Sequence, residues 1–194
     1  MSSTPAIIIR RASADDADAI ARVHVDTWRS AYAGIIADRT LAGMSYNASA
    51  RRQLDLLGDS ARFAFVAADS EFGIAGFSMG GPSRDPVADC DGELYGLYVH
   101  PDHQGRGIGK LLVAAIAGSL EDNGFSRLML WVLAANPARD FYERIGGALL
   151  KDEDIEIKGQ TLRAVSYGWD VGFLLKETAG HCEIANPGIG NTSA

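Results

Sequence analysis

The chain has 194 residues, of which 47% are hydrophobic and 22% charged, and it carries a formal net charge of −7 with a pI near 5.0. This composition is typical of a globular protein with its own core, and it excludes disordered and fibrous chains. The acidic balance disfavours nucleic acid as a partner, because phosphate neutralisation needs clustered lysine and arginine. It weakly favours cationic substrates such as amines.

The positions of the cysteines and of the apolar residues restrict the class of protein further. Cys90 and Cys182 lie far apart, and neither they nor the four scattered histidines have the spacing of a zinc site, so we expect no metal cofactor. The N-terminal residues lack the layout of a signal peptide, and no apolar run approaches the roughly 18 residues of a membrane span. We therefore expect a cytoplasmic protein with no membrane partner.

The first third of the chain predicts a strand and two helices. Residues 6–11 form a short apolar strand, and Ser13 is expected to cap a helix that has two aspartates in its first turn. Apolar residues at helical spacing carry that helix to about Gly34. A second short helix fits residues 48–57, which end before a glycine.

The middle of the chain predicts a β-hairpin and a further strand. Residues 63–67 and 74–79 are strand-like and are separated by a short turn. Residues 80–92 have the composition of a loop, and residues 93–99 form a mostly apolar strand. Gly96 inside this strand indicates a β-bulge or a close backbone approach.

The clearest helix spans residues 108–120, where apolar side chains recur at i, i+3, i+4, i+7, i+8 and i+12. A buried strand is expected at residues 127–133. Asn136 and Pro137 then predict the start of another helix, with asparagine as the N-cap and proline as the first helical residue.

The order of elements predicts a single α/β domain, which we assign to residues 1–174. Residues 154–157 and 162–169 are its last two strands, and a mixed sheet with helices on both faces is the natural packing for the series. The remaining segment, 175–194, is small and polar, and we expect a flexible tail or a peripheral arm.

Residues 103–110, with the sequence HQGRGIGK, place three glycines in five positions between a buried strand and an amphipathic helix. Glycine lets a backbone approach a ligand closely, and the helix supplies free N–H groups and the positive end of its dipole. Arg106 and Lys110 add positive charge. The segment therefore predicts a cradle for a pyrophosphate, although a glycine-rich turn that merely starts a helix would look the same.

Two familiar nucleotide loops do not fit this segment. A Walker A loop would need glycine and serine or threonine where the chain has Gln104 and Leu111. A dinucleotide fingerprint, Gly-x-Gly-x-x-Gly, fails from Gly105 and from Gly107 alike, because its last position is not glycine. Both failures disfavour a nucleotide-binding protein.

The pattern Gln104-x-x-Gly107-x-Gly109 resembles the Gln/Arg-x-x-Gly-x-Gly/Ala signature of GNAT acetyltransferases, where it binds the pyrophosphate of coenzyme A. Residues 92–112 resemble the strand, loop and helix around that signature, and residues 130–147 resemble the family's next strand and helix. Together with the first helix, the resemblance covers residues 6 to 170 in order. It implies a mixed, mostly antiparallel α/β (α+β) sheet with splayed central strands.

The resemblance also implies how acetyl-CoA would bind as the cosubstrate. The backbone of Leu97, Tyr98 and Val99 would pair with the pantetheine arm like an added strand, and an N–H of Tyr98 or Val99 would polarise the thioester carbonyl. Asn136 would contact the pantetheine. The pyrophosphate contacts would come from Gln104, Gly105, Arg106, Gly107, Gly109 and Lys110.

Glu93 matches a glutamate that acts as the general base in several members of the family. An alkyl amine with a pKa of about 10.4 must lose a proton before it can attack a thioester. The plainer alternative is a carboxylate at the edge of a strand, and Tyr95 or Asp91 lies close enough in sequence to replace it. A base role predicts that Glu93→Gln lowers turnover more at neutral than at high pH.

Tyr142 matches the family tyrosine that protonates the departing thiolate, although it also fits a core aromatic beside Phe141. Trp28, Arg29 and Tyr32 are expected to contact the acceptor, because the first helices flank the acceptor cleft in this family. Trp28 on an apolar helix face fits the core equally well.

The leading hypothesis is an N-acetyltransferase that moves an acetyl group from acetyl-CoA to a primary amine of a small molecule, peptide or protein. Transfer would be direct, because only Cys90 lies anywhere near the motif. Alternatives are another acyl-CoA or a hydroxyl acceptor, and a non-catalytic acyl-CoA-binding or sensor module. A homodimer is compatible with the sheet edges, and the acceptor stays open because fold does not determine function.

Overall fold

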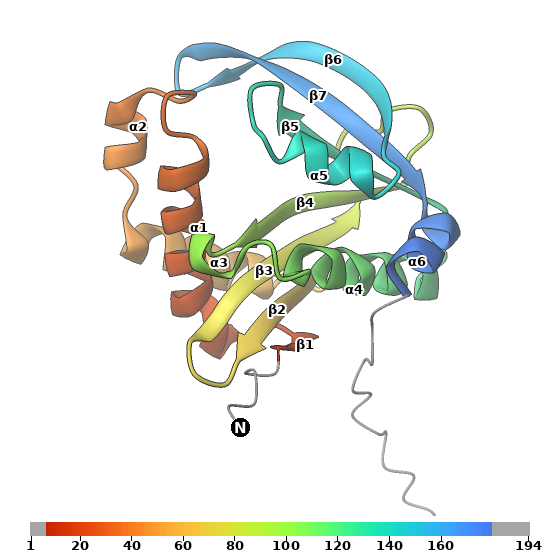
Figure 1. The fold of residues 1–194 in the computed structure, drawn as a ribbon, viewed down its shortest axis with the longest axis horizontal. Coiled ribbons are helices and arrows are strands. Elements are labelled where there is room, and N and C mark those ends of the chain that lie inside the picture. The colour runs from red at the N-terminus through yellow and green to blue at the C-terminus, as the bar shows by residue number, and fades with distance from the viewer. Residues whose placement is uncertain (1–6, 180–194) are drawn as a thin grey trace, which may run out of the picture.

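The computed structural model describes residues 7–179, in which seven strands hydrogen-bond in the order β1-β2-β3-β4-β5-β7-β6 (Figure 1). The strands are β1 (Ile7–Arg11), β2 (Phe63–Asp69), β3 (Gly73–Pro82), β4 (Gly92–Val99), β5 (Arg127–Leu133), β6 (Ala148–Ile157) and β7 (Gln160–Asp170). The helices are α1 (Ala17–Ala31), α2 (Asp38–Ala42), α3 (Tyr46–Leu57), α4 (Ile108–Asp122), α5 (Arg139–Arg144) and α6 (Val171–Ala179). Every neighbouring strand pair except β4 and β5 is antiparallel, which confirms the predicted fold class.

Side chains that alternate along β2 explain why the sheet carries helices on both faces. Val66 and Ala67 are neighbours, so they point to opposite faces. Val66 packs with Ile20 and Val23 of α1, whereas Ala67 packs with Leu112 of α4. The helices therefore lie in separate layers, with α1 on one face and α4 on the other (Figure 1).

The parallel strands β4 and β5 stay together for only a short distance. Gly92 pairs with Leu128 and Glu93 with Met129, and no further pair joins these two strands. Beyond this point β4 continues along β3 while β5 continues along β7. The sheet is consequently split at its centre, as the family resemblance implies.

A β-bulge in β4 lies directly after the last β4–β5 pair. Met79 of β3 faces Gly96, but the next residue, Gly80, faces Leu94, so Tyr95 is an extra residue in β4. A bulge bends its strand and increases the local twist. The irregularity predicted at Gly96 is therefore confirmed, and it bends β4 where the strands diverge.

Several elements differ from those expected. The short helix α2 was not expected. The first half of β6, from Ala148, was not predicted either, because many of its side chains are exposed and give a weak alternating pattern. The prediction that Asn136 caps a helix is wrong, since α5 begins at Arg139. The Asn136 side chain instead accepts a hydrogen bond from the N–H of Ala138, 2.9 Å away, in the turn before the helix.

The C-terminal part of the described chain is the helix α6, which packs on α4 (Figure 1). Leu174 is fully buried in the main core cluster. The first residues of the expected tail, 175–179, belong to this helix, while residues 180–194 and Cys182 lie outside the described part. Within residues 7–179 no helix is long and apolar enough to cross a membrane, and no group of three His, Cys, Asp or Glu side chains could hold a metal ion.

The Asp16 carboxylate ties the start of the first helix to β1. Both guanidinium nitrogens of Arg10 donate to it, at 2.7 and 2.8 Å, and the N–H of Ser13 donates at 2.8 Å. The hydrogen bond from Arg10 outweighs the opposing effect of desolvation and lowers the pKa of Asp16, and the Ser13 N–H adds to the lowering. A carboxyl group with a lowered folded-state pKa stabilises the fold above its unfolded pKa, and this stability disappears as the pH falls through the folded pKa.

We therefore expect Asp16→Asn to lower the free energy of unfolding by about 1–2 kcal/mol at neutral pH. The deficit should shrink as the pH falls below about 4, because the carboxyl group is protonated there in the unfolded chain and at still lower pH in the folded protein. Urea denaturation at several pH values measures both effects. The exposed neighbour Asp15 provides the matched control, because Asp15→Asn should change stability by only a few tenths of a kcal/mol. A deficit of equal size at neutral pH and at pH 3 would contradict this assignment.

Candidate functional site

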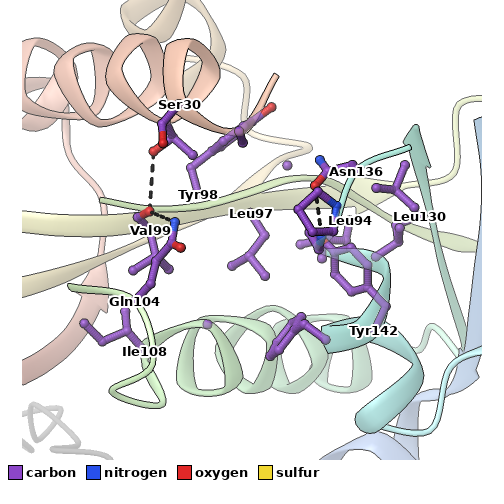
Figure 2. A pocket seen from close by; sticks show the side chains of 18 of the residues that line it. Ser30, Leu94, Leu97, Tyr98, Val99, Gln104, Ile108, Leu130, Asn136 and Tyr142 are labelled. Atoms are coloured by element: carbon purple, nitrogen blue, oxygen red, sulfur yellow. Dashed lines mark hydrogen bonds between the residues drawn. The ribbon is translucent and has the colours of Figure 1, made fainter. Parts of the chain in front are cut away.

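A cavity of about 780 Å³ opens where β4 and β5 separate. Its walls are β4 from Leu94 to Val99, β5 from Leu130 to Val132, the glycine loop, the end of α1 and the start of α5. Figure 2 shows β4 crossing the site, with Ser30 of α1 on one side of the strand and Ile108 of α4 on the other. The size is typical of a ligand site.

The free edge of β4 directs particular backbone groups into this cavity. The N–H of His100 donates to the carbonyl of Ala75 on β3 at 2.8 Å. Because backbone groups alternate in an antiparallel pair, Tyr98 also directs its N–H and C=O toward β3. Leu97 and Val99 direct theirs to the opposite side, where β5 has diverged.

The carbonyl of Val99 is already occupied by side chains. Gln104 Nε2 donates to it at 3.0 Å, as Figure 2 shows, and Thr27 Oγ1 donates at 3.4 Å. Gln104 thus ties the glycine loop to the end of β4, and Thr27 ties α1 to the same point. The groups left free on this edge are the N–H of Val99 and both backbone groups of Leu97.

The glycine loop has the backbone geometry of an anion cradle. Gly105 and Gly107 have φ angles of +74° and +80°, which residues with a Cβ rarely adopt. Gly107 is the N-cap of α4, and the N–H of Lys110 donates to its carbonyl at 3.0 Å. The earlier N–H groups of the first turn have no partner within the helix, so they are available to a bound anion.

Two cationic side chains line the cavity, Lys110 beside the loop and Arg144 on α5. Arg106, which the sequence assigns to the cofactor, is not among the lining residues. Its guanidinium lies 3.6 Å from the Asp69 carboxylate, at the end of β2. The structure therefore places Arg106 in an ion pair that braces the loop from outside.

Tyr142 lies on α5 and reaches the cavity from a mostly buried position. Its ring packs against those of Phe141, Tyr167 and Trp169 at centroid distances of 5.3, 6.4 and 6.2 Å. Burial raises the pKa of the Tyr142 phenol well above 10, with small additions from nearby phenols. The phenol stays protonated at physiological pH and can donate a proton into the cavity.

The side chains of Asn136 and Tyr32 lie beside each other at the cavity. Both line the cavity, and Asn136 is buried (Figure 2). Burial raises the pKa of Tyr32 to about 12, and the Asn136 side chain beside it acts in the opposite direction. Tyr98 approaches from β4, where burial likewise raises its pKa. Three neutral phenols, from Tyr32, Tyr98 and Tyr142, therefore approach one another near the split in the sheet.

Glu93 does not reach the cavity, so the geometry does not support the general-base role expected from the sequence. Its side chain is 3% exposed and is not among the residues that line the cavity. Arg84 holds both carboxylate oxygens: its N–H donates at 3.0 Å, its Nε at 3.1 Å, and its Nη2 makes a further close contact. A carboxylate engaged in this way fastens the loop before β4 to the strand.

Of the three residues expected to contact the acceptor, the structure brings two to the site. Tyr32 lines the large cavity, and Trp28 lines a smaller adjoining pocket. Arg29 points away from both, because its guanidinium donates to the carbonyls of Met44, at 2.9 Å, and Leu41, at 3.5 Å. Arg29 therefore fastens the segment after α1 instead of contacting a ligand.

Sequence reasoning missed the wall that β5 contributes. Leu130, Trp131 and Val132 read as an ordinary buried strand, and only the divergence of β4 exposes one edge of that strand to a ligand. Arg144 was also missed, because it follows Tyr142 on the same helix and carries no motif of its own. A pattern in the sequence that could have signalled these residues is not apparent.

Comparison with known proteins agrees with this geometry. The model of the acetyltransferase (GNAT) family matches residues 24–147. An uncharacterised N-acetyltransferase of Bacillus subtilis, YuaI, is 34% identical over 163 residues, which are 84% of this chain and 92% of that relative. The ribosomal protein bS18-alanine N-acetyltransferase of Haemophilus influenzae is 40% identical over 53 residues, 27% of this chain and 36% of that protein.

A solved structure shares the fold. The PaiA N-acetyltransferase of Thermoplasma acidophilum, crystallised with coenzyme A, has a TM-score of 0.65 and 22% identity, and the match covers 82% of this chain and 98% of that one. The family match spans the split sheet, the glycine loop and α5, which are the parts that form the cavity. The chain therefore belongs to the GNAT family of acetyltransferases and is an acyltransferase.

Proposed function

We propose that this protein moves the acetyl group of acetyl-CoA to a primary amine by direct transfer in a ternary complex. The observation that carries the proposal is the split between β4 and β5, where free backbone groups, a glycine cradle and the Tyr142 phenol open into one cavity. The coenzyme A in the Thermoplasma acidophilum structure and the alanine in the name of the Haemophilus influenzae relative agree with this donor and acceptor.

The residues that line the cavity fit acetyl-CoA as a substrate. The N–H and C=O of Leu97 face the gap and can pair with an extended pantetheine arm, as an added strand would. The first-turn N–H groups of α4 and the Lys110 ammonium can hold the pyrophosphate. The N–H of Val99 is the better placed of the two expected oxyanion donors, because the N–H of Tyr98 points toward β3.

The transfer step balances with the groups present. The amine nitrogen forms a bond to the carbonyl carbon, and the carbon–sulfur bond breaks with its electron pair moving to sulfur. The Tyr142 phenol gives the thiolate its proton, and the proton that leaves the nitrogen passes through water to the phenolate, which restores the phenol. Cys90 is not positioned to carry an acyl group, because it is 1% exposed and does not line the cavity.

Calorimetry followed by a CoA-release assay tests the proposal. We expect the protein to bind acetyl-CoA in preference to ATP and NAD, and to release CoA only when an amine is present. Mass spectrometry should then find the amine heavier by one acetyl group. Binding of ATP or NAD alone would overturn the assignment of the cosubstrate. Acetyl-CoA binding without acetylated product from any amine would favour an acyl-CoA sensor instead.

A further inference from the structure

A second pocket, which we call the aromatic pocket, adjoins the large cavity and has a volume of about 170 Å³. Ten residues of α1, the following segment, β4, β5, β6 and β7 line it: Trp28, Tyr32, Ile36, Tyr98, Trp131, Val132, Leu133, Ile155, Ile157 and Ala164. Its walls are thus hydrocarbon and aromatic rings, apart from two phenol groups and two indole N–H groups.

The aromatic pocket opens onto the part of the cavity where the acetyl group would lie. Four residues line both spaces, namely Tyr32, Tyr98, Trp131 and Val132. Tyr98 is also next to Val99, whose N–H faces the gap. A molecule seated in the aromatic pocket would therefore present its reactive end at the junction, directly against the thioester.

The polar atoms of the pocket are partly satisfied by one another. The Trp28 indole N–H donates to the Tyr98 hydroxyl at 3.3 Å, and the rings of Trp28 and Tyr32 lie 4.8 Å apart with their planes tilted by 56°. Behind them His24 lies 5.1 Å from the Tyr98 ring, and burial lowers the pKa of His24 to about 4, so its imidazole is neutral. This wall therefore offers a ligand aromatic surface and no charge.

Among the described residues, no aspartate or glutamate lines either space. The titratable groups that face them are Tyr32 from the segment after α1, Tyr95 and Tyr98 from β4, His103 and Lys110 from the glycine loop and α4, and Tyr142 and Arg144 from α5. The lining residues of β5, β6 and β7 carry no titratable group. Among the described lining residues, Lys110 and Arg144 carry permanent positive charges, and Arg52 of α3 acts on Tyr98 and His24 from behind the wall.

These surroundings disfavour an ammonium ion at the junction. An apolar lining removes water from the charge, and no carboxylate among the lining residues accepts its proton. At pH 7.4 an α-amino group, with a pKa of about 7.7–8.0, is neutral in roughly a fifth to a third of molecules, whereas an alkyl amine with a pKa of about 10.4 is neutral in about one in a thousand. The neutral fraction therefore differs by roughly 200- to 330-fold.

We infer that the acceptor is the α-amino group at the N-terminus of a peptide or protein whose first residue has an apolar side chain. The side chain fills the aromatic pocket, and the α-amino group meets the thioester already neutral. The volume fits, because an apolar cavity of about 150 Å³ accommodates a benzene ring. Polyamines and aminoglycosides are excluded as preferred acceptors by the lack of carboxylates. The inference rests on the proposed transferase function.

The test compares initial rates of CoA release for matched acceptors. L-Phenylalaninamide and 2-phenylethylamine share a phenyl group but differ in amine pKa, and glycinamide keeps the α-amino group without a side chain. We expect kcat/KM at pH 7.4 for phenylalaninamide to exceed that for phenylethylamine at least about 100-fold, and the gap to narrow as the pH approaches 10. It should exceed that for glycinamide at least about tenfold, from burial of the side chain. Free phenylalanine, whose own carboxylate makes its amino group more basic, should react more slowly at pH 7.4 than a peptide with N-terminal phenylalanine.

Variants of β6 test whether the preference for an apolar side chain arises in the aromatic pocket. Ile157→Trp fills the aromatic pocket, so it should lower kcat/KM for phenylalaninamide about tenfold and leave the value for glycinamide nearly unchanged. Leu149→Trp is the matched control, because Leu149 lies on the same strand, is 60% exposed and lines neither space. Equal rates for phenylalaninamide and glycinamide, or a preference for phenylethylamine or spermidine, would overturn the inference while leaving the transferase function intact. Absence of release with every amine would instead contradict the transferase function.

Discussion

Replacing Tyr142 by phenylalanine should slow acetyl transfer at least about tenfold while leaving the dissociation constant of acetyl-CoA within about twofold. The phenol is the one group on α5 that combines burial, access to the cavity and a pKa raised by desolvation. A neutral phenol can supply the proton that the departing thiolate needs, and proton transfer by a positioned side chain is worth about 10²–10⁴-fold. Phenylalanine retains the ring packing but has no proton to give. Single-turnover kinetics measures the transfer step, and calorimetry measures the affinity.

Tyr167→Phe is the matched control for this experiment. Tyr167 is another buried phenol, 6.4 Å from the Tyr142 ring, but it does not line the cavity, and its hydroxyl bonds to Arg139 and Glu143. Loss of these bonds should lower stability by about 1 kcal/mol and leave the transfer rate nearly unchanged. If Tyr142→Phe transfers acetyl groups as fast as the wild type, the role of general acid is wrong.

Replacing Gly107 by alanine should weaken acetyl-CoA binding about tenfold. Gly107 has a φ of +80°, and a residue with a Cβ pays roughly 1–2 kcal/mol to adopt that conformation. The added Cβ meets no atom within 4 Å in the free protein, so the effect comes from backbone strain and from crowding of the anion. A loop that relaxes from this conformation no longer aims its N–H groups at the pyrophosphate, and 1.4 kcal/mol corresponds to about a tenfold loss of affinity.

Gly159→Ala is the matched control, because it introduces the same backbone strain outside the glycine loop. Gly159 has a φ of +77° and the same open space around an added Cβ, but it lies in the turn between β6 and β7. Both variants should lose about 1 kcal/mol of stability in urea denaturation. Only Gly107→Ala should change the calorimetric dissociation constant of acetyl-CoA, and an equal change in both variants would show that the loop has no specific role.

Local sequence patterns identified the elements that rely on short-range rules. The helical spacing from Ile108 to Leu120 and the glycines at 105 and 107 predicted α4 and its cradle, because helix periodicity and a positive φ are encoded within a few residues. The bulge near Gly96 was likewise visible. The first half of β6 was not predicted, because its many exposed side chains alternate poorly. The helix α2 was not predicted, because it is only five residues long.

The sequence by itself determined a glycine-rich loop before an amphipathic helix, a tyrosine downstream and the element order of a GNAT domain, and it predicted that the loop binds a pyrophosphate. The tertiary structure alone decided which side chains face the ligand. Glu93, Arg106 and Arg29 carry the right chemistry, yet each is engaged elsewhere, by Arg84, Asp69 and backbone carbonyls respectively. The aromatic pocket joins α1 to β5 and β6, segments roughly a hundred residues apart in sequence. Such a pocket depends on where β4 and β5 diverge, and that is a property of strand pairing across the whole sheet.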